Sequence, residues 1–110
     1  MVRYTTPPLT MTIKGYDLTA QQKVWVSIQE DGVAEVDKTG SAVTVTVQTV
    51  DDQPVSTVRC TLTQAESAQF RWEAEVQVNW ISSQNVRLAT IPKKIPIIKQ
   101  LLEQEISYGN

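Results

Sequence analysis

Residues 71–80 read Arg-Trp-Glu-Ala-Glu-Val-Gln-Val-Asn-Trp, and this stretch decides the fold. From Trp72 to Trp80, apolar side chains occupy every second position, and polar or charged ones occupy the positions between them. A period of two residues is that of a half-buried β-strand, because successive side chains point to opposite faces of a sheet. We therefore predict a strand here, with Trp72 and Trp80 in the core and with Glu73 and Glu75 on a solvated face.

The same alternation recurs on both sides of this stretch. It predicts half-buried strands over residues 9–13, 24–28, 43–47 and 58–62, and a last strand region over 86–98. Pro92 and Pro96 interrupt that last region, so we expect it to be an edge strand or to bend. Valine, isoleucine and threonine make up 35 of the 110 residues, which also favours sheet, because their stiff side chains pack well on a pleated surface.

Polar turn sequences separate these runs about every ten residues, a spacing typical of all-β domains. Asp31-Gly32, which lies between the run 24–28 and a further β-rich run over 33–38, is the strongest hairpin signal, and 39–41, 51–54 and 82–85 are further turns. Thr63-Gln64-Ala65-Glu66 matches a capping box, which predicts one or two helical turns near residues 64–70. The tail from 99 to 106 has apolar residues at helical spacing, but one more short strand is an alternative.

Taken together, these patterns predict one all-β domain over residues 1–110. We expect an immunoglobulin-like antiparallel β-sandwich of seven to eight strands with one short helical turn. A small closed barrel is the structural alternative. The chain of 12.3 kDa is long enough to bury one core without a metal or a disulfide.

The composition excludes most site chemistry. The chain has no histidine, and Cys60 is its only cysteine, which removes histidine-dependent triads and most zinc and haem sites. We expect Cys60 to be a core residue, because it alternates with Val58 and Leu62. The acidic pairs fall in turns or on a solvated strand face. We therefore expect no catalytic residues, no cofactor and no metal.

The charge and hydropathy patterns also limit the partners. A net charge of −2 argues against nucleic-acid binding. No apolar run is long enough to cross a bilayer, and the first 20 residues do not read as a signal peptide, so we expect no membrane association.

A few residues are candidates for partner binding. Trp25 falls on the outward parity of its strand, and Tyr16 lies near it in sequence. An outward tryptophan is a contact for a protein partner, a stacking platform for a sugar, or a residue covered by the chain's own tail. Arg87, Lys93 and Lys94 form the main basic cluster, which protection of an exposed edge strand also explains.

Several short motifs, in this order, resemble a family of small phage proteins. These motifs are Arg3-Tyr4-Thr5-Thr6-Pro7, Lys38, the segment Leu62–Ser67 with Phe70, Val76-Gln77-Val78, and Arg87 with Ala89-Thr90. The family is encoded in the structural modules (head–tail and tail) of phages and prophages of Firmicutes. This chain departs from the family pattern at Tyr4, where glycine is usual, and at Ala65, which is inserted before Glu66.

The resemblance implies a virion-associated β-sandwich with a distant likeness to the N-terminal domains of upper baseplate proteins. It implies no catalytic residues. We therefore expect a non-enzymatic structural protein of a phage tail or baseplate, found in the virion and, during assembly, in the host cytoplasm. Its partners would be other phage structural proteins or further copies of itself. The alternative is a carbohydrate-binding module for host attachment.

Overall fold

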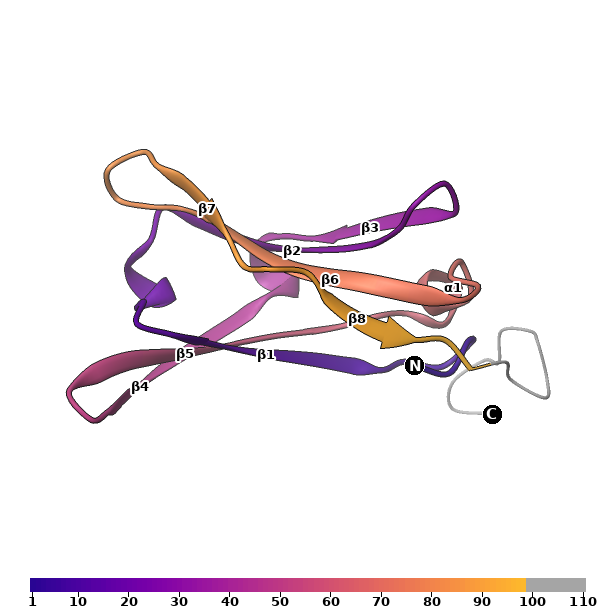
Figure 1. Ribbon diagram of the computed structural model, residues 1–110, viewed down its shortest axis with the longest axis horizontal. Helices are drawn as coiled ribbons and strands as arrows, with labels where there is room; N and C mark the ends of the chain where they lie inside the picture. The colour runs from indigo at the N-terminus through magenta and orange to yellow at the C-terminus, as the bar shows by residue number, and fades with distance from the viewer. Residues whose placement is uncertain (99–110) are drawn as a thin grey trace.

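The computed structural model describes residues 1–98 as two antiparallel sheets packed face to face (Figure 1). The smaller sheet has the order β1 (Pro8–Lys14), β5 (Gln53–Thr61), β4 (Thr44–Val50). The larger sheet has the order β3 (Ala34–Lys38), β2 (Lys23–Glu30), β6 (Glu73–Ile81), and β6 then pairs with both β7 (Arg87–Ala89) and β8 (Lys93–Pro96). The predicted all-β sandwich of seven to eight strands is confirmed.

The core lies between the two sheets and is built mostly from the inward positions that the alternation predicts, together with Phe70, which lies between α1 and β6. Val47, an inward position of the predicted run 43–47, is instead 41% exposed. The side chains of Val26, Val58, Leu62, Phe70 and Val78 are all fully buried. Trp80 and Cys60 are buried with them, as expected, and burial raises the pKa of the Cys60 thiol. The thiol therefore packs as a small apolar group and is not poised to react.

The hairpins form where the turn sequences predict them, with different geometries. Between β4 and β5 the two turn residues, Asp51 and Asp52, both have positive φ, of 51° and 62°. This is the pattern of a type I′ turn, whose twist matches that of the paired strands. Between β2 and β3 the turn covers residues 31–33, and within it only Gly32 has positive φ.

The last strand region bends, as its prolines predict. β7 and β8 lie along the same edge of β6 but are separated by residues 90–92. Thr90 keeps the bend attached, because its backbone N–H donates to the Val78 carbonyl and its hydroxyl accepts from the Val78 N–H. This broken strand closes one side of the larger sheet.

The helical turn is α1 (Gln64–Ser67), shorter than the predicted range, and both hydrogen bonds of its capping box are present. Two short 3₁₀ turns complete the fold, η1 (Leu18–Ala20) and η2 (Gly40–Ala42). In the part of the chain from 1 to 98, no helix is long and apolar enough to cross a membrane. The tail from 99 to 106, for which the sequence predicts helix or strand, lies outside the described residues.

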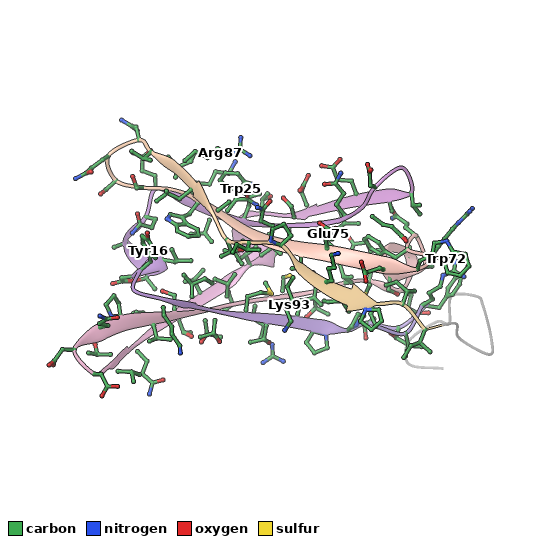
Figure 2. The ribbon with its side chains drawn as sticks, viewed as in Figure 1. Tyr16, Trp25, Trp72, Glu75, Arg87 and Lys93 are labelled. Atoms are coloured by element: carbon green, nitrogen blue, oxygen red, sulfur yellow. The ribbon has the colours of Figure 1, made fainter. Side chains whose placement is uncertain are left out.

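The prediction for Trp72 is wrong. Its side chain is 79% exposed, whereas Trp80 at the other end of the same alternation is only 3% exposed. The reason is that β6 begins at Glu73, so that Trp72 lies just before the strand and its side chain does not follow the pleat. Figure 2 shows Trp72 at the end of the sandwich where α1 lies.

Candidate interaction surface

The outward side chains of the larger sheet form a polar surface, which we call the outer face. The strand register arranges it in successive rows across β3, β2, β6 and β7 or β8. In order along the strands, the rows are Lys23–Ile81–Arg87, Trp25–Asn79–Ala89, Asp37–Ser27–Gln77 and Glu35–Gln29–Glu75–Lys94. Lys23 and Arg87 lie at one end of these rows, Asp37 lies in the middle, and Glu35 and Glu75 lie at the other end together with Lys94.

At the cationic end of the outer face, two positive groups gather on one indole ring. The Lys23 ammonium and the Arg87 guanidinium each lie 5.3 Å from the centroid of the Trp25 ring. Such cation–π contacts hold long, flexible side chains in place over the ring. The structure thus brings together Trp25 and Arg87, two of the predicted site residues (Figure 2), and adds Lys23, which sequence reasoning missed.

At the acidic end, Gln29, Asp31 and Glu75 line a depression of about 300 Å³. Glu35 lies next to Gln29 in the register. The predicted Lys94 is also here, where it is exposed and its ammonium lies 4.0 Å from the Glu73 carboxylate. An exposed pair at this distance contributes little to stability, so that Lys94 remains available to a partner.

Tyr16 does not lie with Trp25. Its ring packs against the buried Trp80, with the ring centroids 5.1 Å apart and the planes tilted by 58°. Tyr16 keeps 45% of its surface exposed, but it belongs to the loop after β1 at the end of the core. The two aromatic rings therefore do not form a shared platform.

Lys93 lines a groove on the open side of the sandwich, between the free edge of β1 and the bend between β7 and β8 (Figure 2). The groove has a volume of about 350 Å³. Its wall is formed by residues 10–13 of β1 with Val76, Thr90, Ile91 and Lys93. Ile91 is 90% exposed at its lip. Lys93 pairs with the buried Val76, so a charge stands at an inward position of an edge strand, which discourages uncontrolled strand pairing.

Trp72 is presented on a fixed backbone, although its side chain is exposed. Its N–H donates to the Glu30 carboxylate at 2.9 Å, and its carbonyl accepts from the Ile97 N–H at 3.0 Å. Glu30 also accepts from the N–H groups of Arg71 and Glu73, at 2.6 and 3.1 Å. A large apolar side chain on an ordered backbone is an anchor that loses little backbone entropy on binding.

The Glu30 carboxylate is charged although Glu30 is only 9% exposed. Burial by itself raises its pKa, but the three backbone N–H donors and the charge of Arg71 outweigh burial and hold the pKa below its usual value. A signal for this residue is present in the sequence, because Glu30 continues the inward series of Val26 and Ile28. Sequence reasoning missed it because Glu30 directly precedes Asp31-Gly32 and reads as part of the hairpin turn.

Three of the motifs that resemble the phage family contact one another around α1, namely the N-terminal segment, Lys38 and the segment Leu62–Ser67. The Arg3 guanidinium donates to the Ala68 carbonyl at 2.7 Å, and the Ser67 hydroxyl donates to the Thr5 carbonyl at 2.7 Å. Lys38 forms an ion pair with Glu66, the residue of the capping box. Burial raises the pKa of Glu66, but Lys38 and the Thr63 donors lower it further than burial raises it. These residues thus have structural roles that join the N-terminal segment, β3 and α1.

No family model matches the chain, and no significant match exists among curated proteins or solved structures. The resemblance to phage structural proteins therefore stays a prediction. Within residues 1–98, no three histidine, cysteine or acidic side chains are grouped so that they could hold a metal ion.

Proposed function

We propose that this protein is a non-enzymatic structural component of a phage particle, in the tail or baseplate region, and that it acts through contacts with other virion proteins. The observation that carries the proposal is Trp72, whose side chain is 79% exposed while its backbone is hydrogen-bonded on both sides. Tryptophan is the residue type most enriched among binding hot spots, and a side chain this exposed adds almost nothing to the fold. The resemblance to phage structural proteins supplies the biological setting.

The surroundings of Trp72 favour a protein partner. Arg71 and Glu73 beside it are exposed, and Ile98, whose neighbour Ile97 donates to the Trp72 carbonyl, is 55% exposed. An apolar centre with a charged rim is the usual anatomy of a protein–protein interface. The partner surface would hold an apolar pocket for the indole ring.

The test is binding of the purified chain to purified products of the neighbouring structural genes, measured by biolayer interferometry. We expect at least one of them to bind, and Trp72→Ala to weaken that binding about 30-fold or more, as is typical of hot-spot truncation. Val50→Ala is the matched control, because Val50 is 45% exposed at the β4–β5 turn. If no virion protein binds, or if both variants bind like the parent chain, the proposal is wrong.

Carbohydrate recognition is the second candidate, and Trp72 is the aromatic residue that favours it. Lys23 and Arg87 already lie over the Trp25 ring, and Tyr16 packs on Trp80, so neither ring is free to stack fully on a sugar. The Trp72 side chain, in contrast, faces solvent at the end of the sandwich. A glycan array probed with the parent chain and with Trp72→Ala distinguishes the two candidates. Sugar recognition predicts that the parent chain binds at least one glycan and that Trp72→Ala does not, whereas the protein-partner proposal predicts no glycan binding by either chain.

A further inference from the structure

The smaller sheet is narrower than the larger sheet on which it packs. It has three strands, whereas the larger sheet has five and is four strands wide, because β7 and β8 share one edge of β6. The groove of about 350 Å³ lies on the open side of the sandwich, between the free edge of β1 and the bend between β7 and β8 (Figure 2). This volume is at the lower end of the range for binding pockets. The groove thus has the position that a fourth strand of the smaller sheet would occupy.

The edge of β1 at this groove carries backbone groups that can pair with such a strand. The N–H of Gly15, directly after β1, donates to the Pro54 carbonyl of β5. Because bonding positions alternate along an antiparallel pair, the odd-numbered residues of β1 bond to β5, and Thr10 and Thr12 turn their N–H and C=O groups outward. Both threonines line the groove. In the part of the chain that the structure describes, no strand pairs with β1 on this side.

The side chains of the groove combine an apolar lining with one charge. Met11 is half-buried, Val76 is buried, and Ile91 is 90% exposed at the lip. Lys93 is the charged member of the lining, which contains no carboxylate. A strand beside β1 directs every second side chain into the groove, since successive side chains point to opposite faces of a sheet. Apolar side chains at those positions would bury the exposed apolar surface, and a carboxylate would meet the Lys93 ammonium.

We propose that the groove binds an extended segment of another protein, which adds to the smaller sheet as a fourth strand beside β1. This segment has apolar residues at alternate positions and an acidic residue among them. Backbone hydrogen bonds to Thr10 and Thr12 contribute affinity, and the groove selects the side chains that enter it, as in other complexes formed by strand addition. Lys93 rejects segments without an acidic residue, because covering its ammonium without a partner costs free energy.

The charge of β1 argues against a second copy of this chain as the occupant. If two copies paired through their β1 edges, each groove would receive the segment Pro8–Lys14, which contains no acidic residue. Its charged residue is Lys14, so Lys93 would gain no opposite charge. An acidic partner segment supplies that charge. The inference does not rest on the contact proposed for Trp72, which is not among the groove residues.

The experiment pans a library of displayed random peptides of about ten residues, the length of a long strand, on the purified chain. The enriched peptides are then synthesised, and their binding is measured by fluorescence anisotropy. We expect enriched sequences to alternate apolar and polar residues and to carry an acidic residue at one of the apolar-parity positions. Trp72→Ala should bind these peptides like the parent chain, so that this inference and the proposed function can fail independently.

Two matched pairs of variants locate the bound peptide. Thr12→Pro removes an N–H from the groove edge, and Thr49→Pro removes one from the free edge of β4, where Thr49 lies opposite Pro54 and also turns outward. We expect only Thr12→Pro to weaken binding, by about tenfold. Lys93→Glu should weaken binding of the acidic peptides about a hundredfold, whereas Lys94→Glu, on the outer face, should leave it unchanged.

Panning on Lys93→Glu should enrich basic residues in place of the acidic one, which keeps the inference testable if Thr12→Pro does not fold. The inference is overturned if no peptide is enriched, if the enriched peptides lack an acidic residue, or if the two members of each variant pair bind alike. Self-association of the parent chain that Thr12→Pro abolishes, without peptide binding, would assign the edge to a second copy and also overturn it.

Discussion

Glu30 shows how one buried charge can organise an exposed site. Its carboxylate lies at the end of β2, inside the sandwich, and accepts three backbone N–H groups from residues 71–73. Those residues would otherwise be a loose connection between α1 and β6. The carboxylate fixes this segment, and the segment carries Trp72 outward.

We expect Glu30→Gln to lower the free energy of unfolding by about 2 kcal/mol at neutral pH, because hydrogen bonds to a charged acceptor are stronger than those to an amide. Urea unfolding followed by circular dichroism measures this. Glu75→Gln is the control, since Glu75 is exposed on the same sheet, and we expect it to change stability by less than about 0.5 kcal/mol. Equal effects of the two substitutions would contradict this role of Glu30.

The same carboxylate makes the free energy of unfolding depend on pH, and the direction of its pKa shift tells whether stability is lost in acid or in base. The pKa of Glu30 is lower in the folded protein than its ordinary value of 4.5, so the folded state prefers the charged form. Its contribution to stability is therefore complete above pH 4.5 and is lost as the pH falls through the lowered pKa of the folded state. Accordingly, the stability difference between the parent chain and Glu30→Gln should shrink in acid. A difference that grows as the pH is lowered would contradict the assignment.

Among the elements, β1, β2, β5 and β6 could be predicted because each has one buried face, so the alternation of side chains records the pleat. The alternation also located β4, but no residue of β4 is buried and only Val45 is half-buried, so the expectation of a half-buried strand there was wrong. The prolines likewise predicted the bend between β7 and β8. The same reasoning failed at Trp72, because alternation does not mark where a strand begins. It also missed that Lys38 and Glu66, distant in sequence, form an ion pair, since no local pattern encodes a contact between β3 and α1.

The β4–β5 hairpin offers a test at the level of the element. Asp51 and Asp52 both have positive φ, which costs energy for residues other than glycine and asparagine, and their like charges are adjacent. The double substitution Asp51→Asn with Asp52→Gly should raise the midpoint of thermal unfolding, with a stabilisation of about 0.5–1 kcal/mol. Differential scanning calorimetry would show it. A lower midpoint would mean that the aspartates make a contact that the turn geometry does not explain.

In the molecule as a whole, the candidate binding features lie on different surfaces. Trp72 lies at the α1 end, the charged rows cover the outer face, and the Lys93 groove opens on one side (Figures 1 and 2). A building block of a symmetric assembly needs separate surfaces for separate neighbours. The sandwich supplies a rigid frame that holds these surfaces at fixed positions.

We propose, as the centre of this interpretation, that the chain is part of a phage particle and is held there by protein contacts. The most direct measurement is mass spectrometry of purified, cross-linked particles. We predict that the chain is present in the particle in a fixed copy number. We also predict that Lys94 is cross-linked to a different virion protein, because its ammonium lies 4.0 Å from the carboxylate of Glu73, the residue that follows Trp72. Absence of the chain from particles that contain all other tail proteins would contradict the account.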